Sequence, residues 1–431
     1  MSFFRQSSES SSPSAILAEA GIHRPSVSFS EAFLDSSAAR VRSEIPQEYQ
    51  IKFDELRGGI LAFCREHAIP TEALSNTEVF GAALSSRKIS TESIKKVFPL
   101  FRALEYLIAH KEPFREEFTE PLEYAEHFYH LHEQYSDQVE LFEQIGILQG
   151  EAITGIDGEI YPIPTLEQVA QRLYEQRETL ETKHDQGFTK LLLVPFGMSL
   201  DTLMDILKRF LVSYQQVHPE FYPKSKELFQ MVNYQGVDIG DSPKLIYYPG
   251  SFDSDHQGKT KKQILEEQSE NFDSAPGWMI HLFQPLDIHD PHAHGFALIP
   301  RLTKGQIHGK KILRQELEEG RNPHDYLRQL LRSQHDQTSP YYREQGMTLE
   351  DWILAFIVHL TQTGQPLDNF RSGKDGRSYL MGAFSFSHDN TPLDNTVPVA
   401  CWYENLQKVG LEACDPASGS WHGGIRTTVI I

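Results

Sequence analysis

The C-terminal stretch 397–431 reads VPVACWYENLQKVGLEACDPASGSWHGGIRTTVII. Apolar and β-branched residues at its two ends predict strands over 397–403 and 425–431, and a further strand is expected over 409–413. Its middle interleaves aromatic, charged, amide and small residues without amphipathic order. Such residues on short strands and loops are the usual composition of a binding surface. The stretch therefore predicts a sheet with a binding face, although an ordinary polar loop region has a similar composition.

The chain between 187 and this stretch predicts an α+β domain. The apolar run FTKLLLVP at 188–195 is typical of a buried strand, and a helix over 200–214 follows the capping residue Ser199. A second long helix begins at Thr348, where Thr-Leu-Glu-Asp resembles a capping box. Between the helices lies an irregular insertion rich in Gly, Pro and Asp. Shorter strands are expected at 244–248, 278–283 and 378–385.

The N-terminal part of the chain follows a different pattern. Residues 1–44 are rich in Ser and predict a disordered tail, with one transient helix around 31–41. Residues 45–150 carry apolar residues at helical spacing and predict an accessory bundle of about four helices. The turn-rich stretch 150–164 marks a boundary. A capping-box signature at Thr165 opens a connecting helix, within a linking segment at 151–186.

Composition restricts the class of function. The 431 residues include 40 Lys+Arg and 60 Asp+Glu, a formal net charge of −20, and 39% are hydrophobic. The apolar content excludes wholesale disorder, and the charge argues against a nucleic-acid partner, which needs a basic surface. No apolar stretch approaches the ~20 residues of a membrane span, and no signal peptide is recognisable, so a cytoplasmic location is expected.

The cysteines and histidines leave alternatives open. Three cysteines, Cys64, Cys401 and Cys414, indicate a reduced inventory, although the last two could pair if they lie on adjacent strands. His289, His292 and His294 would suit a transition metal if they converge, but a solvated loop is the simpler interpretation. His127, His130 and His132 lie on a predicted helix, and surface histidines are again a simpler interpretation than a metal site.

Two further patterns have simpler structural explanations. Gly258-Lys-Thr260 suggests a phosphate-binding loop, but the preceding glycine, Gly250, lies too far away for that motif, which excludes nucleotide binding there. Carboxylates near helix starts are better explained by helix capping than by acid–base chemistry. They are Asp201, Asp205, Glu350 and Asp351.

Several short motifs occur in an informative order. They are Val194-Pro-Phe-Gly-Met198, Gly258-Lys-Thr-Lys-Lys262, Asp351-Trp352, His359-Leu360, Tyr379-Leu-Met-Gly-Ala-Phe384, Trp402, Leu411, Pro416 and Gly423-Gly-Ile-Arg426. In this order they resemble a C-type-lectin-like domain. More narrowly, they are similar to such domains in ultrasmall uncultivated bacteria, which are variable proteins of diversity-generating retroelements. The resemblance covers about 187–431 and implies a lectin-like α+β domain with an irregular insertion.

The resemblance also implies a ligand face. In that family, codons near the end of the gene are rewritten, and the changed side chains form the ligand surface on a constant scaffold. The candidate ligand-binding residues are Trp402, Tyr403, Glu404, Asn405, Gln407, Lys408, Gly410, Glu412, Cys414, Asp415, Ser418, Ser420, Trp421 and His422, of which all but Trp402 would vary. Trp402 would also belong to the scaffold, with Leu411, Gly424, Arg426 and Val429.

The expected function is therefore non-enzymatic binding of a protein or cell-surface ligand, with no cofactor. The N-terminal helical domain would tether the molecule to a further partner. Calcium is not implied, because no clustered carboxylate loop of the sugar-binding kind occurs. The alternative is an oxidase related to formylglycine-generating enzymes, which share the lectin-like fold and depend on paired cysteines that Cys401 and Cys414 could imitate. A metalloenzyme built on the histidine loop is a weaker alternative.

Overall fold

The computed structural model describes most of the chain beyond residue 30. The described residues are 31–33, 37–75, 120–221, 229–231, 234–240, 242–271, 275–287, 290, 292–299, 317–370, 376–387 and 393–431, with scattered positions from 80 to 111. The chain forms two compact units, Met1–Phe118 and Thr119–Ile431.

The first unit is helical where it is described. It contains α3 (Ala38–Ser43), η1 (Gln47–Tyr49), α4 (Gln50–Glu66) and η2 (Thr71–Ser75). One side of α4 buries Phe53, Leu56 and Ile60, as their spacing predicts. Val41 on α3 is buried in the same apolar core, as are Ala32 and Phe33. The sequence predicted a disordered tail over 1–44, but Ala32, Phe33 and Val41 near its end are buried in this core, so the tail is shorter than expected. Residues 1–30 lie outside the described part of the chain.

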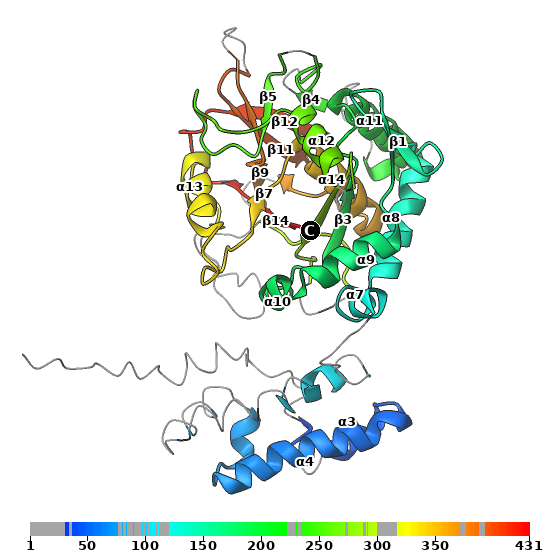
Figure 1. The fold of residues 1–431 in the computed structure, drawn as a ribbon, viewed down its shortest axis with the longest axis vertical. Helices are drawn as coiled ribbons and strands as arrows, with labels where there is room; N and C mark the ends of the chain where they lie inside the picture. The colour runs from blue at the N-terminus through cyan, green and yellow to red at the C-terminus, as the bar shows by residue number, and fades with distance from the viewer. Residues whose placement is uncertain are drawn as a thin grey trace, which may run out of the picture. The chain divides into compact units, whose positions relative to one another are not determined.

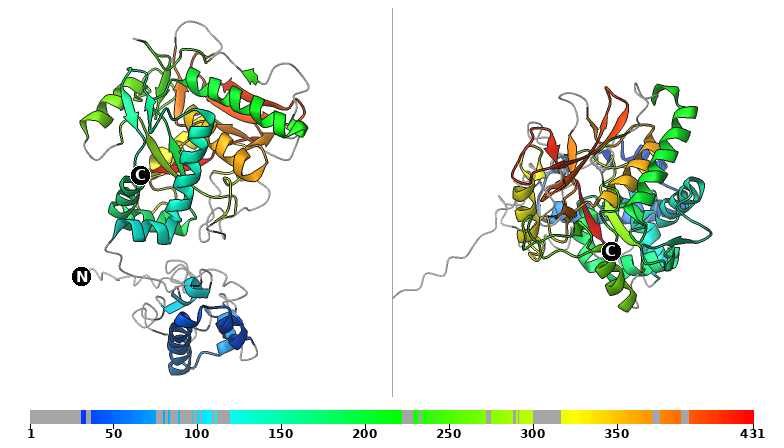
Figure 2. Two further views of the ribbon diagram at one scale, coloured as in Figure 1. Left: turned by 90° about the vertical axis from the view of Figure 1, so that its right-hand side faces the viewer. Right: turned by 90° about the horizontal axis from the view of Figure 1, so that it is seen from above.

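The boundary between the units differs from the one expected near 150. The helices α7 (Pro121–Tyr129) and α8 (Leu131–Ile145) belong to the second unit, so the expected accessory domain 45–150 is divided. The reason is that α8 packs along β3 (Lys190–Val194; Figure 2). The buried side chains of Gln134 and Gln138 on α8 donate hydrogen bonds to Thr189 O and Leu191 O. The single connecting helix is also two helices, α9 (Leu166–Glu175) and α10 (Arg177–Asp185).

The second unit contains two main sheets (Figure 1). The first has the order β3–β6–β14–β7, built from β3, β6 (Met279–Phe283), β14 (Thr427–Ile430) and β7 (Gln345–Gly346), and its neighbouring strands are antiparallel. Every residue of β3 and β6 is buried. The C-terminal strand therefore lies inside a sheet, as its apolar sequence predicts.

The second sheet carries the C-terminal hairpin. Its order is β13 (Gly423–Gly424), β9 (Arg377–Tyr379), β11 (Val397–Tyr403), β12 (Lys408–Cys414) and β4 (Phe229–Met231), with β8 (Asn369–Phe370) also paired to β11. The strand expected over 378–385 is two strands, β9 and β10 (Ala383–Ser385), because the chain turns between them and Gly382 donates its N–H to Met347 O at 2.8 Å. A side chain on Gly382 would collide with the backbone of Gly346 and Met347, so only glycine fits this close approach.

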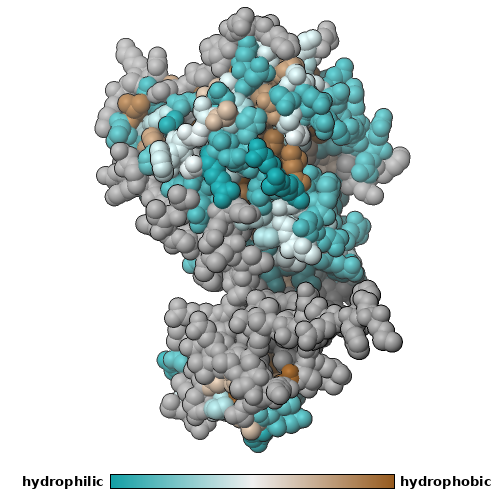
Figure 3. Space-filling model, turned by 90° about the vertical axis from the view of Figure 1, so that its left-hand side faces the viewer, coloured by the Kyte–Doolittle hydropathy of each residue, from teal (hydrophilic) through white to brown (hydrophobic). Residues whose placement is uncertain are grey.

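The remaining elements complete a mixed α+β unit, which is the fold class expected at this level. They are β1 (Ala152–Thr154) paired with β2 (Ile160–Pro162), β5 (Leu245–Tyr247) paired with β10, α11 (Leu200–Val217), η3 (Pro219–Phe221), α12 (Lys261–Glu270), α13 (Pro323–Ser333) and α14 (Leu349–Thr363). No helix in the described ranges is both long and apolar enough to cross a bilayer. On the face drawn in Figure 3, the described surface residues are mostly hydrophilic.

The helix α14 is the centre of the second unit. Residues 349–360 are all buried, so this helix is surrounded by protein rather than exposed along one side. The Thr348–Asp351 capping box forms as predicted, with Thr348 N–H donating to Asp351 Oδ2 at 2.8 Å. Burial on all sides also forces the polar residues of α14 to find partners inside the protein.

Two buried ion clusters supply partners near α14. Arg426 donates to both carboxylate oxygens of Asp368 at 2.8 and 3.1 Å, and Trp352 Nε1 donates to the same carboxylate at 2.8 Å. Lys261 donates to Asp238 Oδ2 at 2.5 Å and forms an ion pair with Glu350 Oε1 at 2.8 Å. The carboxylate of Glu350 is therefore a charge partner in the core, which corrects its interpretation as a helix cap.

The Gly258-Lys-Thr260 stretch has a structural role. Thr260 caps α12 and forms a capping box with Gln263, and the next residue, Lys261, enters the buried ion cluster. Burial alone lowers the pKa of Lys261, but the adjacent carboxylates of Glu350 and Asp238 outweigh it and the net direction is upward.

Acid sensitivity is expected from His359 on α14. Its ring is buried, and Nδ1 accepts the Phe296 N–H at 3.0 Å. Burial, reinforced by the positive charge of Arg426, lowers the pKa of His359 to about 4. The unfolded chain therefore takes up this proton first as pH falls, so the stability is present above about 6.5 and is lost toward pH 4. We expect a loss of about 3 kcal/mol over this range.

Urea unfolding of the wild type and of His359→Gln at pH 7 and pH 4.5 measures this contribution. The variant lacks the imidazole, so its free energy of unfolding should fall less with acid than that of the wild type. Equal losses in the two proteins would show that His359 does not titrate as proposed.

Candidate ligand-binding face

The hairpin of β11 and β12 presents two different faces. Its antiparallel register pairs Cys401 with Gly410 and Trp402 with Val409, and successive side chains alternate between the faces. Trp402 lies on the inner face, where it is 1% exposed, with its ring centroid 5.9 Å from those of Phe356 and Phe221. Trp402 is therefore a core residue, which corrects its place among the ligand-binding candidates and agrees with the scaffold role also expected for it.

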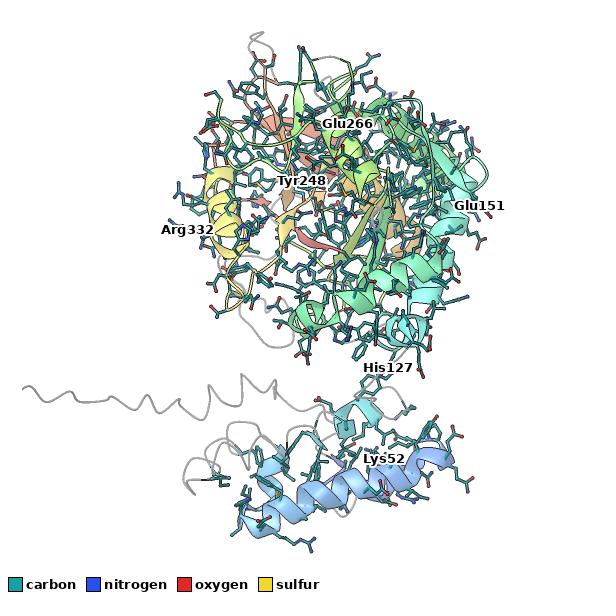
Figure 4. All side chains as sticks on the ribbon, in the orientation of Figure 1. Lys52, His127, Glu151, Tyr248, Glu266 and Arg332 are labelled. Atoms are coloured by element: carbon teal, nitrogen blue, oxygen red, sulfur yellow. The ribbon has the colours of Figure 1, made fainter. Side chains whose placement is uncertain are left out.

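One end of the outer face is covered by α13. Tyr326, Leu327 and Leu330 of that helix belong to one buried apolar cluster with Tyr379, Val397 and Val399 of the sheet. Arg332, on the same helix, projects away from this cluster and is exposed (Figure 4). Cys414 is half-buried against the cluster, so α13 leaves it little access to a ligand.

The other end of the outer face gathers polar and aromatic side chains. We call Phe370, Arg377, Tyr403, Glu412, Trp421 and His422 the candidate face. Tyr403 Oη donates to Glu412 Oε1 at 2.5 Å, and Arg377 Nη1 donates to Glu412 Oε2 at 3.0 Å. Charge-assisted bonds of this kind are strong and directional, so they hold both side chains in place.

Aromatic contacts extend this network. The Arg377 guanidinium lies 4.9 Å from the centroid of the Phe370 ring. Phe370 also makes edge contacts with Tyr403 and His422, at centroid distances of 5.9 and 5.8 Å. Burial and the hydrogen bond to Glu412 raise the pKa of Tyr403, so its hydroxyl stays protonated and can donate. The result is a pre-ordered surface in which aromatic rings surround a half-buried ion pair.

The loop 415–422 adds an exposed tryptophan to the candidate face. Its start is a turn, in which Asp415 Oδ1 accepts the Ala417 N–H at 2.8 Å, and Ser418 is exposed. Near its end, Ser420 N–H donates to Tyr379 Oη at 3.0 Å. Trp421 is 81% exposed, whereas Trp278, Trp352 and Trp402 are exposed by 1% or less. An exposed aromatic side chain of this size offers a large contact area to a partner.

The remaining candidates occupy the hairpin turn or the sheet interior. Asn405 is exposed at the turn, and Gln407, with φ 52°, donates from Nε2 to Glu404 O at 2.9 Å. Lys408 is half-buried where β12 begins. Gly410 is buried, and a side chain there would collide with the Tyr403 ring, so this position supports Tyr403 rather than a ligand.

Phe370 and Arg377 were missed at the sequence level. They lie on β8 and β9, outside the segment 402–422, and reach the candidate face only because both strands pair with β11. No local pattern identifies them, since their position depends on strand pairing between distant segments.

The two C-terminal cysteines lie on adjacent strands but do not meet. Cys401 pairs with Gly410 and Cys414 with Val397, so they are offset by four residues, or about 13 Å along the strands. A disulfide needs Cα atoms within about 7 Å. Burial raises the pKa of both thiols to about 12, which keeps them protonated and weakly nucleophilic at neutral pH. The arrangement offers no paired reactive cysteines of the kind the oxidase alternative requires.

The histidine motifs approach each other in space. The rings of His292 and His130 are tilted by 37° with centroids 4.2 Å apart, and His292 Nδ1 lies 3.3 Å from Glu133 Oε2. His289 lies outside the described residues, while His132 and His294 are exposed. Within the described residues, no three His, Cys, Asp or Glu side chains are placed to hold a metal ion.

Comparisons were made at three levels, with protein-family models, with curated proteins and with solved structures. None of them yields a match to this chain. The functional argument therefore rests on the residues and geometry described above.

Proposed function

We propose that this is a binding protein whose C-terminal part presents a diversifiable ligand face on a C-type-lectin-like scaffold. The observation that carries the proposal is the candidate face itself, where Phe370 joins an ordered Arg377–Glu412–Tyr403 network to His422, the chain neighbour of the exposed Trp421. Aromatic and Arg side chains in such positions dominate the energy of protein interfaces. The ligand is a protein or cell-surface molecule, and the N-terminal unit tethers the molecule to a further partner.

The arrangement of the second unit supports the lectin-like part of the proposal. The C-terminal strand β14 lies inside a sheet, α11 and α14 pack in the same unit, and a separate sheet carries the hairpin of β11 and β12. The alternation along this hairpin separates inner from outer positions. Outer residues beyond the part covered by α13 can change without disturbing the core, which is what a diversified surface on a constant scaffold requires.

The proposal predicts where closely related genes differ. Differences between near-identical relatives should crowd at outer or loop positions and spare the inner ones, and a reverse-transcriptase gene with a near-repeat of these codons should lie nearby. The expected variable positions are Tyr403, Asn405, Lys408, Glu412, Ser418, Trp421 and His422; the expected constant positions are Trp402, Leu411 and Arg426. Differences spread evenly over both sets would contradict the diversification.

A display experiment tests binding itself. Codons for Asn405, Lys408, Trp421 and His422 are randomised in the full chain, and the library is selected against immobilised lysozyme as the probe. The matched control randomises four exposed positions of α12, namely Lys262, Glu266, Glu267 and Glu270. Folded binders from the first library and none from the second would support the proposal. Equal numbers of binders from the two libraries would contradict it.

A further inference from the structure

Arg377 on β9 lies in the middle of the candidate face. Its strand stands between β13 and β11 in the sheet order, and it pairs with Gly423 of β13. The backbone N–H of Arg377 donates to His422 O at 2.6 Å, and the exposed Trp421 directly precedes His422 in the chain. Arg377 therefore lies between the strand that carries Tyr403 and the loop that carries Trp421.

The guanidinium of Arg377 is held by two contacts. Its Nη1 donates to Glu412 Oε2 at 3.0 Å, and its central carbon lies 4.9 Å from the centroid of the Phe370 ring. Glu412 is held in turn, because its other oxygen accepts from Tyr403 Oη. A side chain that is already ordered loses little rotamer freedom when a ligand binds, so the guanidinium is prepared for binding.

One edge of this guanidinium has no partner. Glu412 bonds only to Nη1, which leaves the edge formed by Nε–H and Nη2–H. Within the described residues, these two groups of Arg377 have no hydrogen-bond partner, and neither nitrogen is sealed from solvent. The two N–H groups lie in one plane and are nearly parallel, with the spacing of the two oxygens of a carboxylate. The Nε–Nη2 edge is therefore an open site with two donors.

A structural arginine in the same unit is bonded differently. Arg426 donates from Nε to Ala297 O at 3.0 Å, and from Nη1 and Nη2 to Asp368 at 3.1 and 2.8 Å. Its side chain is 6% exposed, whereas that of Arg377 is 29% exposed. Arg426 thus uses both edges of its guanidinium within the protein, and Arg377 presents one edge to solvent.

The chemistry of the open edge selects its occupant. Each oxygen of Glu412 already accepts a hydrogen bond, so the network has unpaired donors and no unpaired carboxylate oxygen. A carboxylate supplies two acceptor oxygens in one plane and forms two parallel bonds with such an edge. The rings of Phe370 and Trp421 on the same face add apolar contact area, which favours an acidic side chain carried by a protein over a free anion.

We propose that Arg377 is a specificity-determining residue of the candidate face, and that its Nε–Nη2 edge binds the carboxylate of an Asp or Glu side chain in a protein ligand. This inference rests on the proposed binding function and names the chemical group that the face recognises. The ligand carboxylate and Glu412 lie on different edges of the guanidinium, whose positive charge offsets their repulsion. Because Arg377 lies outside the expected variable positions, every variant of the face keeps this acidic anchor.

A library of random peptides displayed on phage tests the assignment. The library is selected on the immobilised full chain, and the bound peptides are sequenced. Peptides that bind the wild type should be enriched in Asp and Glu relative to the unselected library. Replacing the acid of such a peptide by its amide should weaken binding by about 10- to 100-fold, measured by fluorescence anisotropy of the labelled peptide.

Two variants of Arg377 locate the effect. Arg377→Met should weaken the acidic peptides by a similar factor and should bind the acid and amide forms of one peptide equally. Arg377→Lys keeps a positive charge beside Glu412 but lacks the planar edge, so it should also discriminate poorly, and it replaces the Met variant if circular dichroism shows that variant to be unfolded. The control is Arg332→Met, which changes an exposed arginine of α13 outside the candidate face and should bind like the wild type (Figure 4).

The outcomes separate this inference from the proposed function. Binding peptides without enrichment in Asp or Glu, or peptides that bind both Arg377 variants as tightly as the wild type, would overturn the inference and leave the proposed function standing. A library that yields no peptide specific for the folded chain would contradict both. Displacement of the peptides by inorganic phosphate but not by acetate at the same ionic strength would assign the edge to a phosphoryl group and overturn the carboxylate assignment.

Discussion

Asp368→Asn is expected to lower the free energy of unfolding by about 3–5 kcal/mol, because it leaves the buried guanidinium of Arg426 without a counter-charge. Asp368 and Arg426 are 4% and 7% exposed, and the carboxylate also accepts from Trp352 Nε1. Asparagine suits this substitution because Asp368 has φ 50°, a conformation that Asn tolerates, and because its amide oxygen can still accept from Trp352. Urea unfolding followed by circular dichroism measures the change.

The matched control is Asp205→Asn, which breaks an exposed ion pair with Lys208. Its side chains are 69% and 45% exposed, so a loss below about 1 kcal/mol is expected. The double variant Asp368→Asn/Arg426→Met should recover part of the loss, because it removes the uncompensated charge. A single variant as stable as the control would refute the assigned role of the buried pair.

This pair also connects the core to the candidate face. The backbone oxygen of Asp368 accepts the Trp402 N–H at 2.9 Å, and the next residues form β8, which carries Phe370. Loss of the Asp368–Arg426 pair should therefore displace Phe370 and disturb its ring contacts with Tyr403 and His422. Trp402 and Arg426 thus both bond to Asp368, the residue that precedes β8.

Lys261→Met is the second change with a large expected effect, again about 3–5 kcal/mol of unfolding free energy. The ammonium is fully buried between Asp238 and Glu350 and also donates to Met198 O at 2.7 Å. Methionine fills similar space but leaves two carboxylates without a cation. Urea unfolding of the variant and of the wild type at pH 7 measures the loss.

Lys259→Met provides the control for this change. Lys259 lies two residues earlier and pairs with Glu267, with 52% and 56% of the side chains exposed, so little loss is expected. Adding Glu350→Gln to Lys261→Met should restore part of the stability, since Tyr247 Oη can still donate to the amide oxygen. A double variant no more stable than Lys261→Met alone would contradict the proposed charge balance.

Local sequence signals predicted the elements that depend on local physics. The capping boxes at Thr165 and Thr348 form, and the apolar runs at 188–195 and 397–403 are strands close to the expected bounds. The incorrect predictions concern features that depend on contacts between segments far apart in the chain. The helix α8 joined the second unit because Gln134 and Gln138 bond to the backbone at β3, and α7 joined it by packing against α9. A Gln–Gln spacing on a helix does not reveal such partners.

The sequence likewise predicted some features of the candidate face and not others. Strand alternation in the sequence is enough to place Trp402 and Tyr403 on opposite faces, but which face is buried depends on where α14 and α13 pack. Phe370 and Arg377 joined the face only through the pairing of β8 and β9 with β11. The sequence also did not predict the partners of the buried charges on Lys261, Glu350 and Asp368, because each partner comes from a segment far away along the chain.

The sequence by itself thus determined the α+β character of the second unit, its capped helices and the apolar C-terminal strand, because propensity, capping and periodicity act between neighbouring residues. The tertiary structure alone decided the boundary at 118/119, the residues of the candidate face and the bonds from Gln134 and Gln138 to the backbone at β3. These features depend on hydrogen bonds and ion pairs between residues far apart in the chain, and such contacts are fixed only when the whole unit has packed.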